Sequence, residues 1–335
     1  MTRLNLRRAY TRLVSDTIPE ALARIRIGKF QYKVHQPSGR ERPARANFSL
    51  AVPFNYAVAN NTKRGTVAVV CHLFHANLSG WLLQALQQSG LSGDLYISTD
   101  TAEKAGIIKN VLSEWKGGAT EIRVVENRGR DIAPKLITFA DIYDRYDLVL
   151  FLHSKRSSHF DFGNAWREHL VRCLAGSPAV VDSIMEIFAR CPKIGMVVPQ
   201  HFGPLWAIMQ IAWGKNFRTA RQLAWRMDID LEARGYLDMP SGSMFWARPE
   251  ALRPLIDLQL DFQDFPPEPC PVDGTIAHAI ERLFLFGCEK SGYDWVKVTE
   301  VTDDPTAVEI TSPSEISGFI ARHGFHLLGR GGRHR

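Results

Sequence analysis

The sequence lacks the marks of several protein classes. Its five cysteines show no CxxC spacing, so neither a zinc site nor a disulfide framework is predicted, and a reducing compartment is expected. No apolar stretch approaches the roughly 18 residues that span a bilayer, and no basic segment followed by an apolar run resembles a secretory signal. We therefore expect a soluble or peripheral protein in the cytoplasm.

Internal repeats and the GxGxxG turn of dinucleotide-binding folds are also missing. What the chain has is an ordinary globular composition of 335 residues, 45% of them hydrophobic and 23% charged. A chain of this length and composition can bury a core in one large domain or in two smaller ones.

Positive charge is concentrated at the start of the chain. Residues 1–46 contain 11 Lys or Arg against 3 acidic residues, although the net charge of the whole chain is only +6. Leu4, Leu6 and Leu13 interleave with arginines, so this basic arm, residues 1–64, is expected either to lie as an amphipathic helix on an anionic membrane or to remain solvated and partly disordered. Nucleic-acid binding is the weakest interpretation, because the arm has no recognised motif and the rest of the chain is not basic.

From residue 66 onward, short apolar runs rich in β-branched residues alternate with segments of helical period, the pattern of βαβ units. This pattern predicts an α/β fold with a mostly parallel central sheet flanked by helices. The predicted strands are 66–74, 94–99, 121–126, 147–153, 193–199 and the start of 241–255. The predicted helices are 78–90, 100–115, 131–143, 164–176, 177–191 and 273–287, with Asp100 and Glu103 placed as a capping box.

The turn after the third predicted strand carries a cluster of polar residues, in the run ENRGRDIAP from 126 to 134. A strand-to-helix turn with exposed backbone N–H groups can hold an anion, and Arg128 and Arg130 add forked donors suited to phosphate. Alternatively, Asn127 to Gly129 simply form the turn and Asp131 caps the helix. Both interpretations stay open for each residue taken singly.

The fourth predicted strand, DLVLFLH, runs directly into the polar residues SKRS. Because α/β proteins bind ligands at the carboxyl edge of the sheet, His153 and Lys155 are candidates to offset negative charge without a metal. An exposed loop without function is the alternative. Asp100, after the second strand, is likewise either a ligand-binding residue or a helix cap.

The order of these runs resembles the rhamnan synthesis protein F family, glycosyltransferase-like proteins of bacterial envelope polysaccharide assembly. The resemblance covers residues 66–300 and is carried by LYISTD, ENRGRDIAP, YDLVLFLHSKRS, IGMVVP, GSMFWARPEAL and DGTIAHAIERLF. It implies a GT-A-like nucleotide-sugar-binding domain over residues 65–300, preceded by the basic arm and followed by a tail, residues 301–335.

The resemblance also implies which residues bind the donor. Asp100 would hold the nucleobase or ribose, and the other donor residues would be Asn127, Arg128, Arg130, Asp131, His153 and Lys155. The run LHSK falls where many GT-A enzymes have an Asp-x-Asp motif that binds a divalent ion, and it contains no carboxylate. We therefore assign no metal ligand and no certain cofactor; a divalent metal stays open but is not indicated, and Lys155 is expected in its place. Asp161 is a weaker metal candidate, and the literal Asp-x-Asp at 228–230 follows a helical stretch rather than a strand.

Transfer with inversion requires a general base that takes a proton from the acceptor hydroxyl. The resemblance places Asp273 in this role, at the start of a helix as in inverting GT-A enzymes; capping of that helix is the alternative. Gly242, Ser243 and Trp246 are expected to shape the acceptor side, through close approach and a stacking face, although a core strand explains the run equally well.

The function implied by the resemblance is transfer of a sugar, L-rhamnose from dTDP-rhamnose, to a growing or lipid-linked polysaccharide such as lipopolysaccharide at the inner face of the cytoplasmic membrane. The residues themselves do not distinguish this sugar and nucleotide from others. No nucleic-acid partner is expected. Two other classes stay open: a non-catalytic glycan- or nucleotide-binding module with a degenerate site, and a nucleic-acid-binding protein led by the basic arm.

Overall fold

The computed structural model describes residues 47–58, 65–154, 163–205, 213–232, 237–304, 307–324 and 326–328, with the backbone of two further strands. These strands, β1 (Ala23–Ile27) and β2 (Phe30–Val34), pair antiparallel. The start of the basic arm, where an amphipathic helix was considered, lies outside the described residues.

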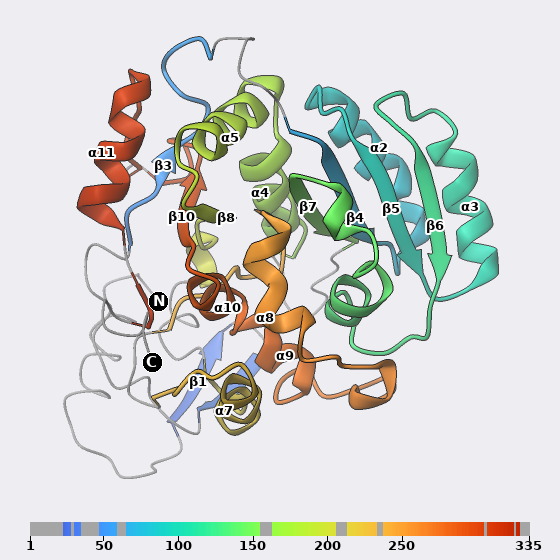
Figure 1. The fold of residues 1–335 in the computed structure, drawn as a ribbon. Coiled ribbons are helices and arrows are strands. Elements are labelled where there is room, and N and C mark those ends of the chain that lie inside the picture. The colour runs from blue at the N-terminus through green and yellow to red at the C-terminus, as the bar shows by residue number, and fades with distance from the viewer. Residues whose placement is uncertain are drawn as a thin grey trace.

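An eight-stranded sheet forms the centre of the molecule (Figure 1), with the strand order β3-β10-β8-β9-β7-β4-β5-β6. Neighbouring strands are parallel except at β9, which runs antiparallel to both β7 and β8. The strands are β3 (Leu50–Ala51), β4 (Val67–His72), β5 (Asp94–Thr99), β6 (Thr120–Val124), β7 (Leu148–His153), β8 (Ile194–Pro199), β9 (Phe245–Ala247) and β10 (Asp294–Thr299).

The hydrophobic core lies on both faces of this sheet. Successive strand residues point to opposite faces, so Leu150 and Leu152 of β7 join one buried cluster while Val149 and Phe151 join the other. Strands that are apolar on both faces are typical of parallel sheets covered by helices on both sides. The predicted α/β class, a mostly parallel central sheet flanked by helices, is confirmed.

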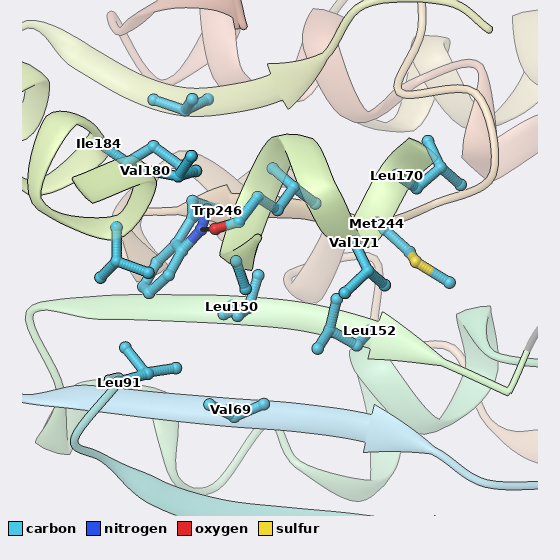
Figure 2. Packing of buried hydrophobic residues seen from close by; sticks show 14 of the residues in the cluster. Val69, Leu91, Leu150, Leu152, Leu170, Val171, Val180, Ile184, Met244 and Trp246 are labelled. Carbon is cyan, nitrogen blue, oxygen red and sulfur yellow. Dashed lines mark hydrogen bonds between the residues drawn. The ribbon is translucent and has the colours of Figure 1, made fainter. Parts of the chain in front are cut away.

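Helices close both clusters. One is covered by α2 (Ser79–Gln88), α3 (Ala102–Leu112), α4 (Gly163–Ala175), α5 (Pro178–Arg190) and α11 (Pro313–His323). The other is covered by the π-helix η3 (Pro134–Thr138), α7 (Phe217–Arg226), α8 (Arg253–Ile256), α9 (Ile276–Glu281) and α10 (Phe284–Lys290). Figure 2 shows part of the first cluster, where Trp246 of β9 packs near Leu150 and Val180.

Three predicted helix boundaries are wrong for local reasons. The N-cap of α3 is Thr101, whose hydroxyl accepts the Lys104 N–H at 3.2 Å, so the capping box expected at Asp100 does not form. The helix expected over 131–143 is a short π-helix that begins at Pro134. The helix expected over 273–287 is divided into α9 and α10, and Thr275 rather than Asp273 occupies the N-cap position of α9.

Segments on either side of residues 65–300 pack on the same core. β3 pairs with β10, and Ile316 and Phe319 of α11 lie in the same cluster as Leu50. The domain boundaries at residues 64 and 300 stay a prediction. The described segments outside these boundaries, β3 and α11, pack on the predicted domain. None of the helices in the described ranges is both long enough and apolar enough to cross a membrane.

Candidate functional site

Polar side chains gather where β4, β7 and the turn before β9 meet. His72 and His153 end the paired parallel strands β4 and β7 opposite each other, and β9 begins at this edge because it runs antiparallel to β7. The turn at Gly242 and Ser243 therefore lies beside His153, whose Nε2 donates to the Gly242 carbonyl at 2.7 Å. Predicted donor-side and acceptor-side residues are thus in direct contact.

The turn before β9 adopts a backbone that few residues tolerate. Gly242 has φ +89° and Ser243 has φ +55°, both in the left-handed region. A Cβ at Gly242 would be strained at this φ and would lie 2.6 Å from Leu170 Cδ1, so a larger residue there would also force Leu170 to shift. The Gly242 N–H donates to Glu281 Oε1 at 3.0 Å, which connects the turn to α9.

A buried ion pair supports the turn from the side of the ENRGRDIAP run. Lys135 Nζ lies 2.5 Å from Asp131 Oδ2 and donates to the Ser243 carbonyl at 2.6 Å. Burial alone would raise the pKa of Asp131, but the neighbouring His153 and Lys135 outweigh it and hold that pKa well below its usual range. Asp131 is therefore ionised and buried, and it holds Lys135 in place against the Ser243 carbonyl.

Arg128 and Arg130 bind the loop that precedes α9. Arg128 donates to the Phe265 carbonyl at 3.1 Å, and Arg130 donates to the Pro271 carbonyl at 3.2 Å and lies 3.5 Å from Glu268 Oε1. The Arg130 side chain is still 38% exposed. A guanidinium has five N–H donors. These contacts, together with those of Nη2 to Cys270 and of Nη1 to His278, leave one N–H of Arg130 for an anionic ligand.

His278 of α9 is a further partner of Arg130. Arg130 Nη1 lies 3.0 Å from His278 Nε2, and His278 Nδ1 lies 2.7 Å from Thr275 Oγ1. Burial, followed by the charge of Arg130, lowers the pKa of His278 to about 4. The imidazole is therefore neutral at pH 7, with Nε2 accepting from Arg130 and Nδ1 donating to Thr275.

Asp273 lies just ahead of α9 and is held by three donors. Asn216 Nδ2 donates to Oδ1 at 2.6 Å, the Lys215 N–H donates to Oδ2 at 3.1 Å, and Arg282 Nη2 lies 3.5 Å from Oδ1. Burial opposes ionisation, but Arg282 and Asn216 outweigh it and lower the pKa of Asp273 below its ordinary value. Since Thr275 is the cap of α9, the alternative that Asp273 caps this helix is wrong.

Arg282 joins Asp273 to the rest of the site. Its Nη1 lies 3.7 Å from Glu281 Oε2, and Glu281 accepts the Gly242 N–H. A continuous chain of contacts therefore runs from His153 through the Gly242 turn, Glu281 and Arg282 to Asp273. Asp273 is thus connected to one candidate donor residue, His153, and to one candidate acceptor residue, Gly242.

Comparison with known proteins gives the family. The family model described as rhamnan synthesis protein F matches residues 34–293. This chain belongs to the rhamnan synthesis protein F family. It is 35% identical over 255 residues to the uncharacterised protein WxcX from two strains of Xanthomonas campestris pv. campestris, a match that covers 75% of this chain and 36% of each relative. The chain thus spans about a third of the length of these curated relatives.

A solved structure also matches at low similarity. It is the mannosyltransferase PcManGT from Pyrobaculum calidifontis in complex with GDP-Man and Mn²⁺, with 12% sequence identity and a TM-score of 0.40. The match covers 74% of this chain and 59% of that one. Membership of the rhamnan synthesis protein F family supports the glycosyltransferase class expected from the sequence, whereas the sugar, the stereochemical course and the base belong to the proposal below.

The remaining predicted site residues lie outside the chain of contacts that links His153 to Asp273. Asp100 follows β5 and accepts from Lys104 Nζ at 2.5 Å, and Asn127 is exposed in its turn. Lys155 and Asp161 lie outside the described residues. The prediction that Trp246 stacks on the acceptor sugar is wrong. Its ring is fully buried and its indole N–H donates to the Leu174 carbonyl at 3.0 Å, so no face of the ring is open to a sugar.

The described end of β7 does not fit a divalent cation. His153 donates to Gly242, and Ser154 Oγ accepts the His75 N–H at 2.9 Å. Neither residue is a carboxylate, and Mn²⁺ and Mg²⁺ sites favour oxygen ligands. Asp228 of the literal Asp-x-Asp pairs with Lys290 at 2.7 Å, at the carboxyl end of α7.

Four buried polar residues were missed by reasoning from the sequence. His201 Nε2 lies 2.7 Å from Asp238 Oδ1, His201 Nδ1 lies 3.1 Å from Ser241 Oγ, and Lys297 Nζ forms an ion pair with Asp238 Oδ2. The residue types are those of a hydrolase triad, but Ser241 is buried and the two ring nitrogens have the opposite roles. The set instead anchors the residue before Gly242. The feature of the sequence that could have indicated this set is Lys297, a charged residue inside an otherwise apolar strand.

Within the described ranges, one group of side chains has the types and spacing of a metal site: His169, Cys173 and Asp303. His169 Nδ1 lies 2.9 Å from Asp303 Oδ2 and Nε2 lies 2.8 Å from the Gln200 carbonyl. Burial opposes protonation, but hydrogen bonds to Cys173, Gln200 and Asp303 outweigh it and raise the pKa of His169 to about 9. Both ring nitrogens of His169 thus face acceptors, and Arg172 is also bound to Asp303, so the group is held together as a cluster of ion pairs and hydrogen bonds.

Proposed function

We propose that this protein is an inverting glycosyltransferase that transfers L-rhamnose from a dTDP-activated donor to a growing or lipid-linked cell-envelope polysaccharide. The observation that carries the proposal is the chain of contacts from His153 through Gly242, Glu281 and Arg282 to Asp273. It connects the residues to which we assign the roles of base, donor contact and acceptor contact. The family supports the reaction class, and rhamnose comes from the family resemblance alone.

In the proposed reaction, the acceptor oxygen forms a bond to the anomeric carbon as its proton moves to an Asp273 carboxylate oxygen. The bond between that carbon and the diphosphate breaks, and the diphosphate leaves with the electron pair. Arg282 keeps Asp273 ionised and ready to accept the proton. The remaining N–H donor of Arg130, together with Lys155, is proposed to offset the charge that develops on the leaving group.

A thermal-shift screen against nucleotide-sugars tests the proposal directly. A ligand bound only by the folded state, at a hundredfold excess over its Kd, stabilises it by about 2.7 kcal/mol. We expect dTDP-rhamnose to raise the unfolding midpoint more than UDP-, GDP- and ADP-sugars, with free dTDP as the control for the nucleotide alone. No shift with any nucleotide-sugar would refute the donor site, and binding without transfer to any acceptor would identify a non-catalytic module.

A second prediction concerns the replacement of a metal by Lys155. We expect Lys155→Ala to lower kcat by about a hundredfold, the usual loss when one charge-stabilising donor is removed, and a chelator to leave wild-type activity unchanged. Lys116→Ala, which removes an exposed lysine after α3, is the matched control. Full activity in Lys155→Ala, or loss of wild-type activity on chelation, would contradict the role.

A further inference from the structure

The outward face of α7 is exposed, aromatic and basic. Its inner residues Ala220, Leu223 and Ala224 are buried in the core. Its outer side presents Arg218, Arg221 and Trp225, spaced so that they share one side of the helix. Trp225 is 76% exposed, the most exposed large hydrophobic residue of the described chain. In Figure 1, α7 lies at the periphery of the molecule, away from the central sheet.

The charge of this face is of one sign. Residues 213–226 contain Lys215, Arg218, Arg221 and Arg226 and no acidic residue. Within the part of the chain that the structure describes, neither Arg218 nor Arg221 forms an ion pair, whereas the nearby Asp228 is paired with Lys290. The two arginines are therefore available to an anionic partner.

A hollow of about 450 Å³ adjoins the exposed tryptophan. Phe217 and Ile229 give it apolar walls, Arg218 and Arg221 lie at its side, and Asp230 adds one negative charge. An apolar recess next to unpaired cations and an exposed indole suits a partner with both apolar and anionic parts. It does not suit the basic arm of this chain, whose charge has the same sign.

We propose that the outward face of α7, comprising Arg218, Arg221 and Trp225, docks on a bilayer surface that carries anionic lipid headgroups. Tryptophan side chains concentrate at the membrane-water interface, where the ring is half in contact with apolar chains. Each Lys or Arg near an anionic surface contributes about 1 kcal/mol of attraction. A single-stranded nucleic acid fits less well, because such sites stack successive bases on several aromatic rings, and this face exposes one.

The position of α7 connects this surface to the candidate site. The residues just before the helix, Lys215 and Asn216, are the ones that hold Asp273. Docking through α7 would therefore place the candidate base near the membrane surface, where a lipid-linked acceptor is presented. The placement of the base near a lipid-linked acceptor rests on the proposed function. The docking itself does not rest on it and can be measured without any sugar transfer.

Vesicle sedimentation with the full chain tests the docking. We expect binding to vesicles of phosphatidylcholine with 30% phosphatidylglycerol, little binding to pure phosphatidylcholine, and loss of binding as salt rises. Arg218→Gln/Arg221→Gln should weaken the partition coefficient about 30-fold, the equivalent of two cation contacts. Trp225→Ser should weaken it further.

The matched control removes two exposed cations elsewhere. Lys109→Gln/Lys116→Gln, on and after α3, causes the same change of net charge and should bind like the wild type; unfolding midpoints of all variants verify that the chain is folded. Equal binding by the two double variants would overturn the proposal, because the basic arm would then account for the affinity. It would also be overturned if the α7 substitutions weakened binding to a single-stranded oligonucleotide while vesicle binding was unchanged.

Discussion

Asp273→Asn should lower kcat a hundredfold or more while the donor Kd remains within about twofold. The amide cannot take the acceptor proton, and a positioned general base typically contributes a factor of about 10² to 10⁴. The amide is nearly isosteric with the carboxylate, and it can still accept from Asn216 through its remaining oxygen. Steady-state transfer kinetics and calorimetric titration of the donor measure the two quantities separately.

Asp228→Asn is the control for this substitution, since Asp228 is an exposed aspartate paired with Lys290. It should leave kcat unchanged. The pH profile gives an independent test, because Asp273 has a pKa lowered below its ordinary value, through Arg282 and Asn216 acting against burial. The base is then ionised throughout the neutral range, and kcat should fall only below the usual pKa of aspartate. Near-normal turnover in Asp273→Asn would remove Asp273 from the role.

Lys135→Met should destabilise the protein by about 3–5 kcal/mol, measured by urea unfolding. Lys135 is buried with Asp131 at 2.5 Å, and removal of one member of a buried pair leaves the other as an uncompensated buried charge. The loss of the Ser243 contact should also disturb the turn before β9. We therefore expect transfer activity to fall even at temperatures where the variant remains folded.

The double variant Asp131→Asn/Lys135→Met is the control, because it removes both charges together. It should recover most of the lost stability, since replacement of a whole buried pair is often close to neutral. In the wild type, the lowered pKa of Asp131 means that the pair stabilises the fold above the pKa of an unfolded aspartate. This stability is lost as the pH falls toward the lower folded value. A double variant no more stable than Lys135→Met would show that the charge pair is not the cause.

The ends of the sheet strands could be predicted well from the sequence. Runs such as LVLFL (148–152) are apolar at every position, which in a strand means burial on both faces, and the first polar residue after them marks the carboxyl edge. His153 and Asp100 were placed at this edge on those grounds. Helix starts were predicted less well, since Thr101 and Asp100 are both good caps and the backbone at β5 decides between them.

The partners of the edge residues could not be predicted. The sequence predicts that Arg128 and Arg130 donate hydrogen bonds to a phosphate. Both also bind the loop before α9, more than 130 residues away in the sequence. Trp246 lies in a run that suits either a stacking face or a core strand, and the packing of α4 and α5 against β9 decides for the core. The helix α7 was not predicted, because it lies in the aromatic stretch 200–240, with Trp206, Trp213 and Trp225, to which no element was assigned.

The sequence by itself determined the fold class, the position of the polar edge and the family, because hydrophobic period and short motifs are local properties of the chain. Only the tertiary structure decided which polar groups are neutralised by one another and which face outward. Asp131 with Lys135, and Asp238 with Lys297, are ion pairs across 4 and 59 residues of sequence. The Asp131–Lys135 pair is local, but the Asp238–Lys297 pair and the contact of Lys135 with the Ser243 carbonyl depend on which segments become neighbours; here β9 enters the sheet antiparallel between β7 and β8.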